Sequence, residues 1–185
     1  MAKTPSNMLA LKTKAPDFTL LDTKSNTHLS LNELKGNKAT VIMFICNHCP
    51  FVIHINPELV KLANDYHSKG VNFIAISSND VVNYPQDGPD KMQLHAKENN
   101  YSFPYLYDAT QEVAKAYDAA CTPDFYIFNT DLELSYRGQL DDSRPGNNIL
   151  LNGNDMRHAL DCILSNSPNT QEQKPSIGCN IKWKN

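Results

Sequence analysis

Two cysteines, Cys46 and Cys49, stand between a continuous apolar run at residues 41–45 and a segment with helical periodicity. An apolar run without turn-forming residues is typical of a buried central strand. Two cysteines three positions apart on a first helical turn can close a small disulfide. Backbone N–H groups and the helix dipole favour a thiolate there. Because a thiolate is the nucleophile of thiol–disulfide exchange, the pattern indicates redox chemistry.

The bulk composition limits the other function classes. The net charge is −3 and the basic residues are scattered, which argues against a nucleic-acid partner or an anionic membrane surface. No run reaches membrane-spanning length and the first residues lack an apolar signal region, so we expect a cytoplasmic protein without a membrane partner. Five cysteines are too few for a disulfide framework in 185 residues, and in a reducing compartment they indicate catalysis, metal binding or packing.

Strand-like runs and amphipathic segments alternate along the chain, which predicts an α/β protein with a central mixed β-sheet flanked by helices. Residues 1–15 read as a loose arm. Thr110 is the expected cap of one short helix, and Asn154 or Asp155 that of the last one. Strands are expected near residues 17–21, 28–30, 40–45, 71–76, 103–106, 125–128 and 132–136, and helices near 50–69, 89–99, 110–117 and 154–164.

The order strand, Cys-x-x-Cys, helix, strand, then Thr122-Pro123 before a hairpin resembles the thioredoxin fold over about residues 14–166. Residues 44–50, 138–148 and 175–179 are similar to the peroxiredoxin-like 1 group, in the redoxin branch related to AhpC/TSA proteins. The resemblance implies a single thioredoxin-like domain over 1–185, with an N-terminal extension and a C-terminal tail at 167–185.

The resemblance also implies roles for individual residues. Cys46 corresponds to the nucleophilic cysteine of thioredoxins and Cys49 to the resolving one. Pro123 corresponds to their cis proline, which would turn the Thr122 backbone toward an extended substrate. The implied substrates are protein or small-molecule disulfides, dithiols or peroxides. A thiol electron donor is implied as well, and no cofactor or metal is expected.

Two positions depart from the patterns of related families. Thr40 stands where thioredoxins have a buried acid. The peroxidatic cysteine of peroxiredoxins aligns with Cys49, but the threonine and proline of their motif would fall at Cys46 and Ile42. Ordinary peroxiredoxin catalysis is therefore not expected.

Near the motif, His48 has two interpretations. As an imidazolium it would stabilise a Cys46 thiolate, and we expect the Cys46 pKa to lie below the ordinary value of about 8.5. Otherwise His48 is an exposed bystander. Cys121, directly before Thr122, is either a third redox partner or a core thiol.

Two further groups lie outside the motif. Cys179 belongs to a tail that ends in an apolar cluster with Trp183. Either the tail docks beside the motif and makes Cys179 an alternative resolving thiol, or it only covers an apolar patch. Asp142 and Arg144 are expected to form an ion pair that orders their loop, unless Arg144 binds an anionic substrate or holds the tail.

Three functions remain open on the sequence alone. The first is a thiol–disulfide oxidoreductase with possible peroxide-reducing activity. The second is a copper or zinc module that uses Cys46, His48 and Cys49, completed by Cys121 or Cys179. The third is a redox-inactive scaffold that binds a protein partner.

Overall fold

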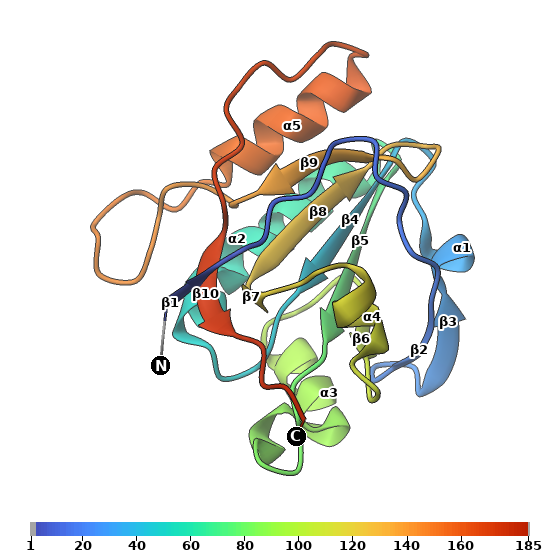
Figure 1. The fold of residues 1–185 in the computed structure, drawn as a ribbon, viewed down its shortest axis with the longest axis vertical. Coiled ribbons are helices and arrows are strands. Elements are labelled where there is room, and N and C mark those ends of the chain that lie inside the picture. The colour runs from blue at the N-terminus through green and yellow to red at the C-terminus, as the bar shows by residue number, and fades with distance from the viewer. Residues whose placement is uncertain (1–2, 185) are drawn as a thin grey trace.

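A seven-stranded mixed sheet forms the centre of the computed structural model, which describes residues 3–184 (Figure 1). Its order is β3-β2-β6-β5-β4-β8-β9. Strand β4 pairs in parallel with β5 and antiparallel with β8, so the predicted mixed sheet is confirmed. The strands are β2 (Thr19–Asp22), β3 (Thr27–Ser30), β4 (Ala39–Phe44), β5 (Val71–Ser77), β6 (Tyr105–Tyr107), β8 (Asp124–Phe128) and β9 (Leu134–Gly138).

A second, three-stranded sheet joins the two ends of the chain. Its order is β1 (Lys3–Pro5), β10 (Ile177–Asn180) and β7 (Cys121–Thr122), and both pairings are antiparallel. The expectation of a loose arm at residues 1–15 was therefore wrong for β1. Its backbone hydrogen bonds are satisfied by the tail, a partner that is remote in sequence.

Helices cover both faces of the central sheet (Figure 1). Successive β4 side chains point to opposite faces: Val41 and Met43 pack in one core cluster with α2, α3 and α5, whereas Ile42 and Phe44 pack in the other with α1 and α4. Within the described residues, no helix has the length and apolar character to cross a membrane. The helices are α1 (Leu31–Leu34), α2 (Pro50–His67), α3 (Pro89–Glu98), α4 (Glu112–Ala116) and α5 (Asn154–Leu164), with a 3₁₀ turn, η1 (Pro85–Asp87).

Two helix caps differ from those predicted. Helix α4 is preceded by Gln111 at φ 65° rather than capped by Thr110, and α5 by Gly153 at φ 65° rather than by Asn154 or Asp155. In both cases the chain enters the helix from a left-handed residue. The preferred N-cap geometry is extended, so the nearby polar side chains do not take the cap position.

A buried ion pair anchors the segment around Pro123. Asp124 and Arg137 are both inaccessible to solvent and form an ion pair across the β8–β9 hairpin. The Arg137 guanidinium also lies 3.8 Å from the centre of the Tyr126 ring. Asp124 accepts a hydrogen bond from Ala120 N at 3.1 Å. These contacts hold the chain on both sides of the Thr122–Pro123 bond.

Candidate active site

Strand pairing brings the two parts of the predicted site together. Phe44, the last residue of β4, pairs with Asp124, the first residue of β8. The chain therefore enters the cysteine motif directly beside the point where it leaves the Thr122–Pro123 bond, which is cis. Cys46 Sγ lies 3.3 Å from Thr122 Oγ1, and Cys49 Sγ lies 3.1 Å from Thr122 O.

Helix α2 begins at the second cysteine of the motif. Cys49 is its N-cap residue and Pro50 occupies the first helical position. Proline is tolerated there because the N–H of this position has no partner within the helix. The 18-residue helix directs the positive end of its dipole at this cysteine. Both sulfurs are shielded, because Cys46 is 1% and Cys49 0% exposed.

The tail supplies a third sulfur. Strand β10 pairs with β7 so that Cys179 stands opposite Thr122. Cys49 Sγ and Cys179 Sγ are 2.9 Å apart, and all five cysteines are free thiols. The structure thus shows the tail docked beside the motif, one of the two arrangements considered for Cys179.

The two cysteines of the motif have opposite pKa shifts. The hydrogen bond of Cys49 with Cys46 is the main reason that the Cys49 pKa falls to about 5; burial opposes this, and hydrogen bonds with the Cys179 thiol and the Val52 and Cys179 backbone contribute further. The same Cys46–Cys49 hydrogen bond, then burial and the Asp87 carboxylate, raise the Cys46 pKa well above its ordinary value. The predicted lowering of the Cys46 pKa was therefore wrong. These shifts favour the thiolate at the cysteine on the helix N-terminus and the thiol at its partner.

Asp87 is a site residue that the sequence did not reveal. It is fully buried and accepts hydrogen bonds from Asn47 N at 2.9 Å and from Asn79 Nδ2 at 2.8 Å. Its carboxylate lies 2.7 Å from His48 Nδ1. Asp87 and Asn47 are 40 positions apart, so no local pattern connects them.

Asp87 also changes the candidate metal-ligand set. One ligand atom each from Cys46, His48 and Asp87 lie within 4.8 Å of one another. Cys49 does not belong to this group, in contrast to the predicted set of Cys46, His48 and Cys49. The Tyr84 ring stacks on His48 with centroids 5.9 Å apart, which limits the orientations of the imidazole.

Cys121 is a neighbour of the site with different contacts. Its sulfur lies 3.5 Å from Pro123 O, and its strand position is opposite Asn180 of the tail. Burial raises the Cys121 pKa, so this thiol keeps its proton near neutral pH. Its surroundings are those of a core thiol.

The charged loop does not contain the predicted Asp142–Arg144 ion pair. Asp142 instead pairs with Lys174 of the tail segment at 3.0 Å. The Arg144 guanidinium donates to Asp141 O and Ser143 O at 2.6 and 2.7 Å. Because the guanidinium donates to carbonyl groups of its own loop, the Asp142 carboxylate forms its ion pair with Lys174 instead. Arg144 also lines a narrow crevice shared with Pro123 and Ile177, so the loop borders the docked tail.

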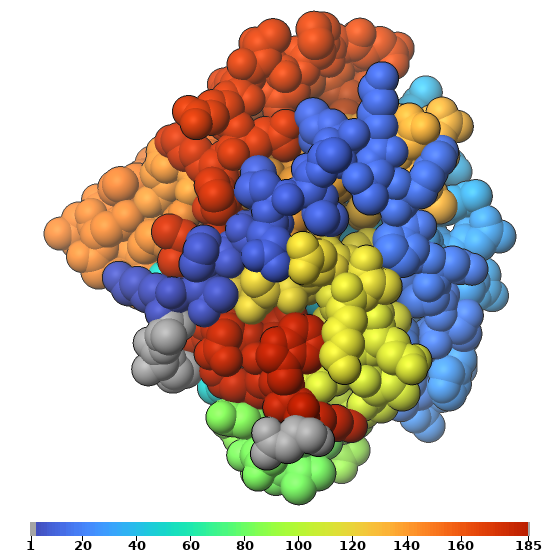
Figure 2. Space-filling model, viewed as in Figure 1, coloured from blue at the N-terminus to red at the C-terminus, as the bar shows by residue number. Residues whose placement is uncertain are grey.

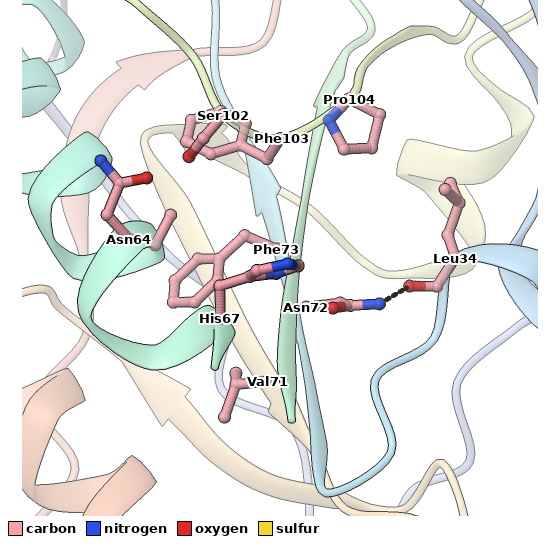
Figure 3. Close-up of a pocket in the computed structure, with 10 residues that line it drawn as sticks. Leu34, Asn64, His67, Val71, Asn72, Phe73, Ser102, Phe103 and Pro104 are labelled. Atoms are coloured by element: carbon pink, nitrogen blue, oxygen red, sulfur yellow. Dashed lines mark hydrogen bonds between the residues drawn. The ribbon is translucent and has the colours of Figure 1, made fainter. Parts of the chain in front are cut away.

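A cavity lies at the end of α2 that is away from the cysteines. The cavity, of about 410 Å³, is lined by the end of α2, the start of β5 and residues 102–104 (Figure 3). His67 and Phe73 are among its lining residues, and the lining residue Asn72 donates a hydrogen bond to Leu34 O at 3.0 Å (Figure 3). Since α2 starts at the motif and ends at this cavity, a helix length of roughly 27 Å separates the two places.

The lowered pKa of Cys49 predicts a pH-dependent stability of the reduced protein. The cysteine pKa is 9.0 in the unfolded chain and about 5 for folded Cys49. Between these two pH values the folded chain therefore binds fewer protons than the unfolded chain. The stabilisation is therefore complete above the unfolded pKa. It declines as the pH falls toward the folded one, by at most about 1.4 kcal/mol per pH unit.

We expect the difference in free energy of urea unfolding between reduced wild type and Cys49→Ser to shrink as the pH falls from about 8.5 to about 5. Cys162→Ser on α5 is the matched control for the removal of a buried thiol outside the motif. A constant difference for Cys49→Ser would contradict a thiolate at this position.

The chain is similar along nearly its whole length to two proteins of known structure. Over its whole length, the chain is 59% identical to an uncharacterized conserved protein from Geobacillus kaustophilus, covering 97% of that chain with a TM-score of 0.98. It is 45% identical to a hypothetical protein from Sinorhizobium meliloti, covering 98% of each chain with a TM-score of 0.95. No curated protein matches the sequence.

A more distant likeness concerns the fold alone. The thioredoxin domain of a thiol-disulfide oxidoreductase from Bacteroides vulgatus is 19% identical, with 82% of this chain and 99% of that chain covered and a TM-score of 0.62. The fold is therefore thioredoxin-like, as predicted. The AhpC/TSA family model matches residues 11–137, more than half of the sequence, and the chain belongs to the AhpC/TSA family.

Proposed function

We propose that the chain is a thiol–disulfide oxidoreductase in which Cys46 and Cys49 alternate between a dithiol and a disulfide. The observation that carries the proposal is the pair of thiols at the start of α2, with Cys49 at a pKa of about 5 and next to Thr122. Membership of the AhpC/TSA family and the similarity to a thiol-disulfide oxidoreductase domain support it.

The charge distribution supports Cys49 as the attacking sulfur, rather than Cys46 as expected from thioredoxins. In exchange, the Cys49 thiolate attacks a substrate disulfide and forms a mixed disulfide, and one substrate thiolate leaves. Cys46 then attacks Cys49 Sγ and releases the second substrate thiol, which completes the Cys46–Cys49 disulfide. The raised pKa of Cys46, whose largest cause is its hydrogen bond with Cys49, favours Cys46 as the second, resolving cysteine.

The same pair supports reduction of a hydroperoxide. The Cys49 thiolate attacks the peroxide oxygen, so that the O–O bond breaks and the alcohol or water leaves after protonation. The resulting sulfenic acid condenses with the Cys46 thiol to give a disulfide and one water. A dithiol donor restores both thiols. Because both sulfurs are buried, small hydroperoxides are the favoured oxidants in this reaction.

His48 and Asp87 support the reaction at Cys46. The Asp87 carboxylate, held by Asn47 N and Asn79, faces the His48 imidazole at 2.7 Å. The imidazole and this carboxylate lie in one group with the Cys46 sulfur. The imidazole is therefore available to accept the Cys46 proton when the disulfide closes.

The central prediction concerns turnover with hydrogen peroxide or an aromatic disulfide, with dithiothreitol as the donor. We expect Cys49→Ser to lower kcat/KM by about 1,000-fold or more, because the nucleophile is lost. In a single turnover without donor, Cys46→Ser should still consume one equivalent of oxidant, whereas Cys49→Ser should consume none.

Cys162→Ser serves as the control and should retain wild-type turnover. The proposal fails if Cys49→Ser keeps most of the wild-type rate with both substrates. If Cys46→Ser loses the first oxidation step and Cys49→Ser keeps it, the pair is redox-active but the nucleophile is Cys46.

A second candidate, metal binding, is favoured by the grouping of Cys46, His48 and Asp87. A thiolate, an imidazole and a carboxylate suit zinc, and the first two suit copper. We expect Asp87→Ala to weaken zinc binding at least about 10-fold if this group holds the metal. Zinc titration by calorimetry, with Asp90→Ala as the control, decides this; equal affinity in wild type and Asp87→Ala would rule the group out.

A further inference from the structure

The tail occupies the backbone edge at which an extended substrate was expected. Thr122 pairs with Cys179 and Cys121 with Asn180, in an antiparallel register. On its other edge, β10 pairs with β1, where Cys179 stands opposite Lys3. The position across from Thr122 is therefore filled by the chain itself, and the residue that fills it is a cysteine.

Gly178 explains how the tail comes so close. A Cβ atom at this position would meet Thr122 O at 2.0 Å and Pro123 N at 3.0 Å, which real Cβ atoms do not do. Only glycine permits the approach of the two backbones. The residue directly before Cys179 is thus required for the docking that brings its sulfur to Cys49.

Contacts on both sides of Cys179 fix the strand. Before it, Ser176 Oγ donates to Pro123 O at 2.7 Å, and Ser176 N donates to Ser6 Oγ at 2.9 Å. After it, Ile181 N donates to Ala120 O at 3.2 Å. Lys182 N donates to Asn79 Oδ1 at 2.8 Å. Asn79 also binds Asp87, so the tail is linked to the Asp87–His48 side of the site.

In the space-filling view, the red C-terminal segment lies at the surface between the blue N-terminal segment and the yellow segment before Pro123 (Figure 2). The Cys179 side chain itself is only 3% exposed. A thiol fixed on a surface strand but turned toward the Cys49 sulfur at 2.9 Å is arranged for intramolecular chemistry. A disulfide requires S–S contact at about 2.05 Å, so a shift of less than about 1 Å closes the bond.

We propose that Cys179 is a third redox-active residue, which takes over the disulfide of the motif by forming a Cys49–Cys179 bond. This rests on the proposed function, which supplies the Cys46–Cys49 disulfide. Cys179 Sγ attacks Cys49 Sγ, the Cys46–Cys49 bond breaks and the Cys49–Cys179 bond forms. The proton of Cys179 passes to Cys46, so no electrons are gained or lost and no further reactant is needed.

The exchange has two consequences for the site. Cys46 becomes a free thiol beside His48 and Asp87, while the oxidising equivalent is held between α2 and the tail. The new bond also ties β10 covalently to the motif and so keeps it on the Thr122 edge that it already occupies. Cys49 is the shared member of both disulfides, in keeping with its position between Cys46 and Cys179.

A non-reducing peptide map after treatment with diamide tests the bond directly. We expect Cys46→Ser to give a Cys49–Cys179 disulfide as the main product, and Cys179→Ser to give Cys46–Cys49. Wild type titrated in glutathione buffers should contain both disulfides. The inference is overturned if Cys46→Ser gives no Cys49–Cys179 bond, or if wild type carries only Cys46–Cys49 at every potential.

A second variant tests the dependence on strand docking. In the Cys46→Ser background, Gly178→Ala should reduce the yield of Cys49–Cys179 at least about 5-fold, because the added Cβ meets Thr122 O. Ile177→Ala, on the same strand but at a half-exposed side chain, is the matched control and should leave the yield unchanged. An unchanged yield in Gly178→Ala contradicts the inference.

Turnover of Cys179→Ser separates the two proposals. If this variant loses both the Cys46–Cys49 disulfide and turnover, the proposed function fails. If it keeps both while wild type lacks the Cys49–Cys179 bond, only the role of Cys179 fails.

Discussion

The site depends on the pairing of β4 with β8, which joins the end of one strand to the start of the other at Phe44 and Asp124. The chain that leaves β4 enters α2 through the cysteine motif, and the chain that enters β8 passes through Thr122 and Pro123. The pairing therefore sets the helix N-terminus against the Thr122 backbone, with Cys49 between them. The buried Asp124–Arg137 pair fixes the same corner from the opposite side. Breaking one partner of such a pair costs about 3–5 kcal/mol.

Within this frame, charge and proton are divided between two neighbouring sulfurs. The helix N-terminus and the side-chain hydrogen bonds with Cys46 and Cys179 lower the Cys49 pKa, despite its burial. Asp87 adds a negative charge on the Cys46 side and thus helps to keep that thiol protonated. The tail adds a third sulfur to this pair. Its residue Cys179 contacts Cys49 through a hydrogen bond between the two sulfurs. One central thiolate with two protonated neighbours is the feature that unites the proposed function and the proposed role of Cys179.

Local patterns predicted much of this fold, because they depend on neighbouring residues. The apolar run of β4, the helix after Cys49 and the β8–β9 hairpin all follow from periodicity and turn residues. The site was predictable only in part. Asp87 reaches the motif across 40 positions, and Cys179 reaches Cys49 across 130. Which of the two cysteines has the lowered pKa depends mainly on the side-chain hydrogen bond between them. Asp142 pairs with Lys174, 32 positions away, rather than with the nearby Arg144.

The central claim is that Cys49 is the thiolate of the reduced site. Carbon-13 NMR of protein labelled at the cysteine Cβ measures the protonation of each buried thiol without requiring access to it. We expect the Cys49 signal to titrate with a midpoint near pH 5, while Cys46 stays protonated through neutral pH. A Cys46 signal that titrates first, with Cys49 unchanged until alkaline pH, would contradict the account.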